Sequence, residues 1–360
     1  MKFNLIIDCR TMLTGSRRTL FEPLKLQCCR YFSSENEQTP PRTLITGSLG
    51  QLGLTLAKQM RSRYGKERVV CTDIRKPPKI VLQSGPYRYA NILNKNGLEE
   101  ILVEHRIDQV VHFSALLSAI GEQNVTLALQ VNIEGFHNII DLCKIHELKL
   151  FCPSTIGAFG PETPKNPTPD LTIQRPKTIY GVSKVYMELL GEYYHHRYGL
   201  DFRSARFPGI ISATTPGGGT TDYAVQIFYD AIETGHHECF LEPDTRLPMM
   251  YISDCIQSVI QMMECPEEDL TQRTYNIAAF SFTPAEIVAE VQKYVPLTVD
   301  YKIDKARQRI ASTWPHVLKD NNARRDWRWD PQFNLEKMVP YMLQKVRDQL
   351  HSEQVIKELF

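Results

Sequence analysis

One segment of the chain carries a tyrosine and a lysine at the spacing of a general base and its charged partner. Tyr180 and Lys184 are four residues apart in the run YGVSK, so both side chains lie on one face if the segment is helical. A phenol has an ordinary pKa of about 10 and is a poor base near neutral pH. Because a nearby ammonium stabilises a phenolate, the spacing predicts that Lys184 keeps Tyr180 able to take a proton from an alcohol.

A glycine-rich turn near residue 47 could bind a dinucleotide that takes part in that chemistry. Residues 42–46 predict a short strand, and Gly47, Gly50 and Gly53 follow it at the start of a helical apolar stripe. In a dinucleotide-binding turn, the first glycine permits the turn, the second lets the backbone approach a pyrophosphate, and the third packs the helix on the strand. The anion then lies on N–H groups at the helix start.

An acidic residue indicates which dinucleotide would bind. Residues 68–72 predict a second strand that ends at Asp73, twenty residues after Gly53. A carboxylate there can accept hydrogen bonds from both hydroxyls of an adenosine ribose, whereas a 2′-phosphate would meet like charge. The sequence favours NAD, and the basic residues Arg75 and Lys76 keep NADP as the alternative.

Several later segments match one superfamily. The GxxGxxG spacing, YANIL at 89–93, VVHFSA at 110–115 and VNIEG at 131–135 together resemble the extended short-chain dehydrogenase/reductase superfamily. The resemblance implies an adenine contact near Asn91 and a nicotinamide ribose held by Lys184. Aligning Gly160 with the glycine that ends a serine-rich segment of that superfamily places Thr155 where the substrate hydroxyl is oriented, with Ser154 as the alternative.

The resemblance implies a hydride transfer. Tyr180, as a phenolate, would remove the proton of a secondary alcohol that Thr155 holds, and the carbon-bound hydrogen would leave as hydride to the nicotinamide. The expected catalytic residues are Thr155, Tyr180 and Lys184. The residues expected at the cofactor are Gly47, Leu49, Gly50, Gln51, Leu52, Gly53, Asp73, Arg75, Asn91, Ile92, Ser114, Ala115, Leu116, Asn132, Tyr180, Lys184 and Pro208.

Three stretches differ from the sugar-modifying members of the superfamily. RFPGII at 206–211 lacks the asparagine that binds a substrate diphosphate, and LPMMYISD at 247–254 replaces a VHVDD-like run. PGGGTTDYA at 216–224 offers a glycine turn, two hydroxyls and a carboxylate, which suit a small zwitterion. With SALLSAIGE at 114–122, the chain resembles the short-chain family of L-threonine 3-dehydrogenases over about residues 42–335.

This second resemblance implies oxidation of the 3-hydroxyl of L-threonine to L-2-amino-3-oxobutanoate with NAD. It also implies a homodimer paired through the helices of Glu122 and Tyr180, and no metal. Asp222 would meet the ammonium or fix the loop, while Ser118 and Thr220 receive the carboxylate. Thr220 and Asp222 also suit a helix N-cap. The expected substrate residues are Ser118, Thr155, Tyr180, Thr220 and Asp222.

Composition excludes several classes of protein. The chain of 360 residues is 42% apolar and 23% charged with a net charge of +1, which is too balanced for a nucleic-acid binder. Its apolar stretches fall short of the roughly 20 residues that cross a bilayer. The nine cysteines are an odd number without a CxxC pair, so neither a disulfide framework nor a zinc site is expected.

The N-terminal residues predict a targeting signal. Residues 1–32 hold six basic and two acidic side chains, and RYFS at 30–33 resembles a site of cleavage by matrix peptidases. We therefore expect a mitochondrial transit peptide at 1–32, a location in the matrix and a leader at 33–41. A disordered cytosolic arm is the alternative, because Asp8 and Glu22 are atypical of transit peptides.

The pattern of elements predicts an α/β protein. A Rossmann-type doubly wound parallel sheet would use residues 42–205 with a return strand near 272–280, and a smaller mixed substrate lobe would use 206–271 and 281–345, before a tail at 346–360. Two other functions stay open at this point. One is a nucleotide-sugar epimerase or dehydratase of the same superfamily, and the other is a noncatalytic NAD-binding protein.

Overall fold

The computed structural model of the chain describes residues 39–214 and 219–359, except the side chains of 119 and 353–359. The predicted transit peptide and most of the predicted leader lie outside the described residues. Residues Pro40–Phe360 form one compact unit.

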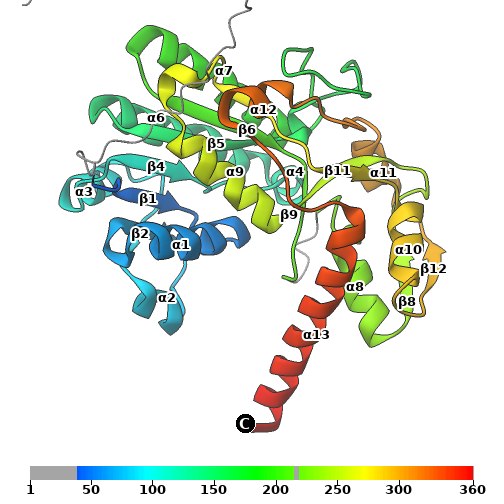
Figure 1. Ribbon diagram of the computed structural model, residues 1–360. Coiled ribbons are helices and arrows are strands. Elements are labelled where there is room, and N and C mark those ends of the chain that lie inside the picture. The colour runs from blue at the N-terminus through cyan, green and yellow to red at the C-terminus, as the bar shows by residue number, and fades with distance from the viewer. Residues whose placement is uncertain (1–38, 215–218, 360) are drawn as a thin grey trace, which may run out of the picture. The chain divides into compact units, whose positions relative to one another are not determined.

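A seven-stranded parallel sheet lies at the centre of this unit (Figure 1). Its spatial order is β10-β6-β5-β4-β1-β2-β3. The order reverses between β1 and β4, and ligands of such sheets bind outside the carboxyl ends of the strands at this point. The doubly wound fold that the sequence predicts is thus confirmed. The strands are β1 (Thr43–Thr46), β2 (Val69–Asp73), β3 (Tyr87–Tyr89), β4 (Gln109–His112), β5 (Lys149–Thr155), β6 (Phe202–Phe207) and β10 (Thr274–Asn276).

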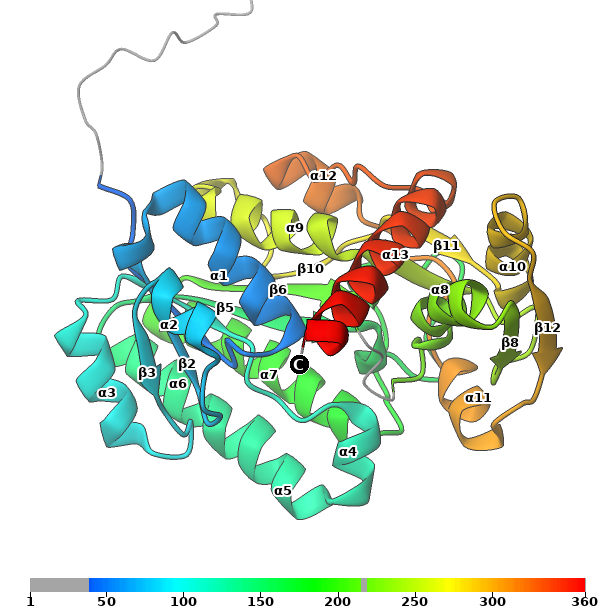
Figure 2. The same cartoon turned by 90° about the horizontal axis from the view of Figure 1, so that it is seen from below.

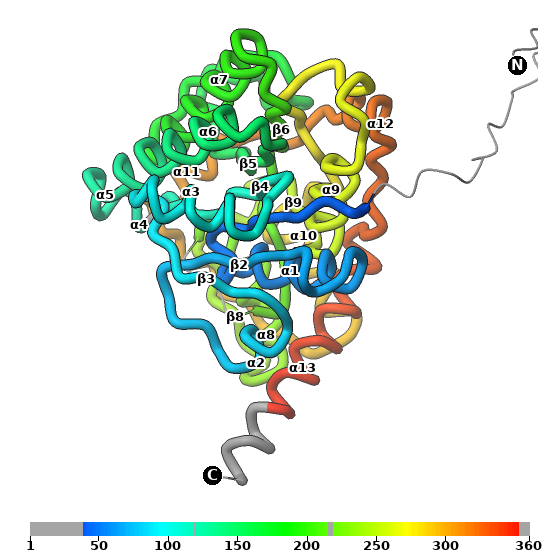
Figure 3. Tube along the Cα trace, turned by 90° about the vertical axis from the view of Figure 1, so that its left-hand side faces the viewer, coloured from blue at the N-terminus to red at the C-terminus, as the bar shows by residue number. Residues whose placement is uncertain are grey.

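Helices cover both faces of the sheet, which explains why β1, β2 and β4 are buried along their whole length. Figures 2 and 3 show α1, α9 and α12 on one face and α3, α6 and α7 on the other. Two short helices, α4 and α5, pack on α7. These helices are α1 (Gln51–Tyr64), α3 (Lys95–Glu104), α4 (Ser118–Gln123), α5 (Val125–Leu129), α6 (Gly135–Ile145), α7 (Ile179–Tyr198), α9 (Ile252–Glu264) and α12 (Asn321–Trp327), with α2 (Lys79–Ser84) before β3.

Two smaller sheets come from the second half of the chain. One has the order β11-β9-β7 and the other pairs β12 with β8. Helices α8, α10 and α13 pack together beside them. A capping box at Thr283 and Glu286 opens α10. The elements are β7 (Gly209–Ile211), β8 (His236–Cys239), β9 (Leu247–Tyr251), β11 (Phe280–Phe282), β12 (Thr298–Tyr301), α8 (Tyr223–Glu233), α10 (Pro284–Gln292), α11 (Lys305–Ala311) and α13 (Leu335–Leu359).

Three of the predicted segment boundaries fall inside elements. The boundary at 205/206 lies within β6, which continues to Phe207, the boundary at 280/281 lies within β11, and the boundary at 345/346 lies within α13. The division into two lobes stays a prediction.

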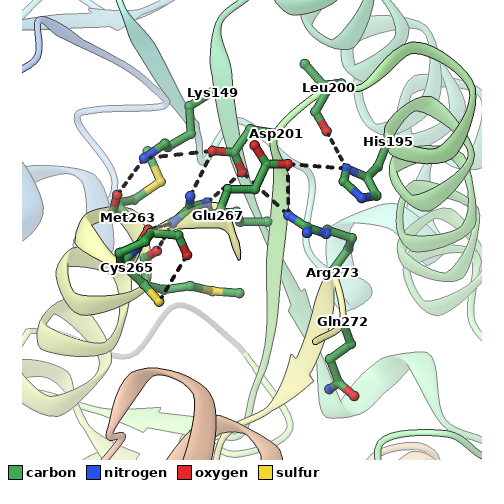
Figure 4. A network of polar contacts seen from close by, with 12 residues as sticks. Lys149, His195, Leu200, Asp201, Met263, Cys265, Glu267, Gln272 and Arg273 are labelled. Carbon is green, nitrogen blue, oxygen red and sulfur yellow. Dashed lines mark hydrogen bonds and ion pairs between the residues drawn. The ribbon is translucent and has the colours of Figure 1, made fainter. Parts of the chain in front are cut away.

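Charged side chains join the amino ends of β5, β6 and β10, at the edge opposite the carboxyl ends (Figure 4). Arg203 is buried and forms a double hydrogen bond with Asp201, at 2.7 and 2.8 Å. Lys149 donates to the carbonyl of Met263, and Arg273 lies 3.3 Å from Glu267. This network connects the strands to the end of α9 and leaves the carboxyl edge for chemistry.

Candidate active site

The glycine turn after β1 has the shape that a dinucleotide requires. Gly47 has φ +63, and a Cβ on it would lie 2.7 Å from the N of Ser114 at the end of β4. A Cβ on Gly53 would lie 2.6 Å from the carbonyl oxygen of Gly47, so only glycine lets α1 begin this close to the turn. Helix α1 has Gly50 as N-cap and no side-chain cap. Its first N–H groups can therefore bind a pyrophosphate, and the residues present fit NAD.

Asp73 ends β2 beside this turn. Its Oδ2 accepts from the N–H of Leu49 at 3.0 Å, and its Oδ1 accepts from the N–H and Nε of Arg75, both at 3.1 Å. Burial alone would raise the pKa of Asp73, but the hydrogen bonds from Arg75 and Leu49 outweigh it and hold that pKa below its usual range. The carboxylate is thus ionised at neutral pH. The Arg75 guanidinium, which the sequence offered as a possible partner of the NADP 2′-phosphate, is paired with this carboxylate instead.

The predicted adenine segment lies next to Asp73. The N–H of Ala90 donates to the carbonyl of Asp73, which brings residues 90–92 beside the ribose position. Ile92 is buried. Its side chain packs against Gly135, where an added Cβ would lie only 2.5 Å from Ile92 Cδ1. Its side chain therefore belongs to the core, and a cofactor could reach only its backbone.

Asn132 organises the segment after β4. Its Oδ1 accepts from the N–H of Leu116 at 2.8 Å, and its Nδ2 donates to the Leu116 carbonyl and to Ser183 Oγ on α7. It lies in a π-helical turn, Gln130–Glu134, a feature frequent at functional sites. Leu116 is thereby held after the carboxyl end of β4, and Ser114 and Ala115 before it line a small cavity together with Lys184.

Thr155 and Tyr180 meet at the carboxyl end of β5. A Cβ on Gly157 would lie 3.5 Å from Thr155 Oγ1 and 3.6 Å from Tyr180 Cδ1, so the two side chains lie beside each other. The Thr155 Oγ1 accepts from the N–H of Gly157 at 3.1 Å. Thr178 is the N-cap of α7 and accepts from the N–H of Gly181, which fixes the turn that presents Tyr180. The structure therefore brings together the hydroxyl and the phenol that the sequence selected.

Lys184 lies one turn along α7, with its Nζ 5.7 Å from the centre of the Tyr180 ring. Its ammonium donates to the carbonyl of Pro153 at 2.7 Å rather than to the phenol oxygen. Burial raises the pKa of Tyr180 to about 12, although the neighbouring Thr155 side chain opposes the rise. Burial also lowers the pKa of Lys184 to about 8. Burial therefore opposes the ionisation of both side chains in this structure, and the role of Tyr180 as a base stays a prediction.

The alternative hydroxyl, Ser154, points away from the reactive pair. It is buried and donates to Glu188 on α7. The alternation of side chains along a strand sends neighbouring residues to opposite faces, so Thr155 faces the site and Ser154 faces the core behind it.

The predicted substrate residues lie on two further segments. Ser118 is the first residue of α4, directly after residues 114–117. Thr220 is buried, and Asp222 precedes α8 and accepts from the N–H of Gly219 at 2.7 Å. Asp222 stands at the N-cap position of α8 but makes no side-chain cap of that helix. Residues 215–218 of the glycine turn lie outside the described residues, and the substrate roles stay predictions.

Pro208 lies buried between β6 and β7. Gln51 connects the glycine turn to the same region, because its Nε2 donates to Ser212 and, at 3.1 Å, to Thr214. Sequence reasoning missed Ser212 and Thr214, which no motif marks. It also missed Glu122 as a contact: its Oε1 accepts at 2.7 Å from the N–H of Ile179, the first residue of α7.

Two absences hold for the described residues alone. Within residues 39–214 and 219–359, no three His, Cys, Asp or Glu side chains are grouped so that they could hold a metal ion. Among the helices of the same ranges, none has the length and apolar character of a membrane span.

Asp73→Ala tests the cofactor site. We expect weaker NAD binding by about tenfold to a hundredfold and a smaller preference for NAD over NADP, because the ribose hydroxyls lose their acceptor. Titration of both dinucleotides by calorimetry measures the two effects, with Asp108→Ala as a control at a carboxylate that binds the N–H of Arg42. An unchanged NAD:NADP ratio in Asp73→Ala would exclude Asp73 from ribose recognition.

Comparisons with known proteins agree with this geometry. A profile of the NAD dependent epimerase/dehydratase family matches residues 43–278. The chain is 56% identical over 339 residues to the mitochondrial L-threonine 3-dehydrogenase of Bos taurus, covering 93% of this chain and 91% of the relative.

Solved structures of similar proteins share the fold. The L-threonine dehydrogenase of Phytophthora infestans has 48% identity and a TM-score of 0.83, over 86% of this chain and 99% of that one. A monomeric L-threonine 3-dehydrogenase from a metagenome has 39% identity and a TM-score of 0.82, over 85% and 99% of the two chains. The chain therefore belongs to the NAD-dependent epimerase/dehydratase family, and within it to the L-threonine 3-dehydrogenases.

Proposed function

We propose that this chain oxidises the 3-hydroxyl of L-threonine to L-2-amino-3-oxobutanoate with NAD. The observation that carries the proposal is the position of Thr155 beside Tyr180 and next to Lys184, at the same sheet edge as the glycine turn and Asp73. The identity with threonine dehydrogenases gives the substrate.

Each residue of the site would have a separate role in the reaction. Thr155 holds the substrate oxygen, and the Tyr180 oxygen takes its proton as the carbon-bound hydrogen leaves. Lys184 lies close enough to stabilise the developing phenolate. When bound, NAD supplies the hydride acceptor. Ser118, Thr220 and Asp222 would meet the carboxylate and ammonium of the amino acid and set its orientation.

An absorbance assay of NADH formation tests the function. L-threonine should be oxidised faster than L-allo-threonine and D-threonine, since the hydroxyl of either stereoisomer departs from the geometry that Thr155 and Tyr180 would hold. UDP-sugars serve as substrates for the alternative epimerase or dehydratase activity. Turnover of a UDP-sugar without turnover of L-threonine would replace the proposal, and binding of NAD without turnover of either would favour a noncatalytic protein.

The chain would act as a homodimer joined through α4, α5 and α7. These helices pack together and leave large apolar side chains exposed, which is typical of an interface when the side chains gather on one region. The exposed residues are Ile120, Val125, Leu129, Val182 and Leu189. A second copy, with the same helices antiparallel by two-fold symmetry, would cover them.

Leu189→Glu tests the dimer. We expect twice the chain mass for the wild type by light scattering and the single-chain mass for the variant, because a buried charge without a partner destabilises an interface. Leu171→Glu, at an exposed leucine before α7, is the control. A wild-type monomer, like the metagenome relative, or a dimeric Leu189→Glu variant would contradict this interface.

We also propose that residues 1–32 direct the chain to the mitochondrial matrix. The basic N-terminal composition and the mitochondrial relative support this location. Protease protection of the processed chain inside isolated mitochondria would be the direct test, and a full-length cytosolic chain would contradict it.

A further inference from the structure

A buried carboxylate lies directly behind the reactive group. Glu188 is on α7, one turn after Lys184 and two turns after Tyr180, and its side chain is 2% exposed. Its Oε1 accepts from Ser154 Oγ and, at 3.0 Å, from Arg206 Nε. Its Oε2 accepts at 2.8 Å from Arg206 Nη2 and at 2.8 Å from Gln174 Nε2. Both oxygens are therefore fully used within the protein.

Two of these donors flank the reactive pair. Ser154 is the neighbour of Thr155 at the end of β5, and Gln174 lies four residues before Thr178, the N-cap of α7. Glu188 is thus bonded to the strand that carries the substrate-orienting hydroxyl and to the segment that leads into the helix of the base. No other described carboxylate bonds to both segments.

Arg206 fixes this carboxylate from the other side. It comes from β6, and its Nη1 donates to the carbonyl of Asp170 at 2.7 Å and to Asn276 Oδ1 on β10 at 3.1 Å. Asn276 in turn donates its N–H to the Asp170 side chain at 2.6 Å. The ion pair between Arg206 and Glu188 is bidentate, which defines the direction of the contact as well as its distance. Buried ion pairs add little stability over apolar residues of the same volume, so a requirement for geometry explains this one better than a requirement for stability.

We propose that Glu188, held by Arg206, is a positioning residue for hydride transfer that sets the separation of Thr155 and Tyr180 through its bonds to Ser154 and Gln174. The inference rests on the proposed function. A displacement of about 1 Å in a reacting group can slow a reaction about a hundredfold, so a fixed link between β5 and α7 matters more for the rate than for binding.

Ser154→Ala and Gln174→Leu each remove one link and leave the Glu188–Arg206 pair intact. We expect kcat with L-threonine to fall about fivefold to thirtyfold in each, the size of one lost charge-assisted hydrogen bond expressed as a rate. The primary deuterium isotope effect on kcat, measured with L-threonine deuterated at carbon 3, should rise, because hydride transfer becomes slower than product release. The affinity for NADH should stay within about twofold.

Ser258→Ala is the matched control. Ser258 is also buried and also donates its hydroxyl, to the carbonyl of Cys255 on α9. This variant has no connection to the reactive pair, so its kcat and isotope effect should equal those of the wild type even if its melting temperature falls.

Glu188→Gln gives a second test that does not depend on full stability. Its melting temperature is measured first, and kcat is then compared with that of the wild type at a temperature where both are folded. The inference alone would be overturned if the wild type oxidises L-threonine and both Ser154→Ala and Gln174→Leu have the same kcat and the same isotope effect as Ser258→Ala. A wild type that does not oxidise L-threonine would overturn the proposed function and this inference with it.

Discussion

Tyr180→Phe is expected to lower kcat with L-threonine by at least about a hundredfold and to leave the affinity for NAD nearly unchanged. The variant removes one oxygen from a side chain that lies beside Thr155 at the carboxyl end of β5. Loss of a general base costs about a hundredfold to ten-thousandfold in rate. The glycine turn and Asp73, which would bind the dinucleotide, do not contact this oxygen. NADH absorbance gives the rate, and calorimetry gives the affinity.

Tyr194→Phe is the matched control for this substitution. Tyr194 is on the same helix, and its hydroxyl donates to Asp141 at 2.6 Å, away from Thr155. Both variants lose one tyrosine hydroxyl from α7, so a general effect on the helix would appear in both. Near-normal turnover of Tyr180→Phe would remove the phenol from the reaction.

Lys184→Met is expected to change the pH dependence as well as the rate. The pKa of Lys184 is lowered by burial to about 8, and that of Tyr180 is raised by burial to about 12. Loss of one proton from the pair can leave a neutral amine beside a phenol or an ammonium beside a phenolate, and the two forms share one proton count. The rate of the wild type should therefore rise as the pH increases through about 8 and level off above it.

Without the amine, only the phenol titrates. The rate of Lys184→Met should then keep rising up to pH 10, about tenfold per pH unit, and should be at least about a hundredfold below the wild type at pH 7. Profiles of kcat/KM against pH measure both features. Lys177→Met, at an exposed lysine near Glu162, should keep the wild-type profile. A plateau above pH 8 in Lys184→Met would show that another group carries this titration.

The sequence by itself determined the parts of this protein that depend on local spacing. A Cβ would clash at Gly47 and at Gly53, and a glycine at position 50 lets a pyrophosphate approach the backbone, so this spacing of glycines could be recognised before any contact was known. The same holds for Asp73 at the end of the second strand. Tyr180 and Lys184 are one helical turn apart and therefore share a face of any helix that contains them.

Only the tertiary structure decided between the two hydroxyls. Ser154 and Thr155 are neighbours of similar chemistry, and a strand sends one to each side. The position of Glu188 behind β5 explains why Ser154 is the residue turned to the core. The partners of Glu188 come from β5, β6 and the segment before α7, so no residue spacing along the chain could have predicted these contacts.

The extent to which burial opposes ionisation of the predicted base was also decided by the tertiary structure. The spacing of Tyr180 and Lys184 states that an ammonium is near, but it does not state how much water is lost around the phenol. Burial disfavours the charged form of both groups, so it raises the pKa of Tyr180 and lowers that of Lys184. Desolvation depends on every element packed around a side chain, whereas a motif records only its neighbours along one helix.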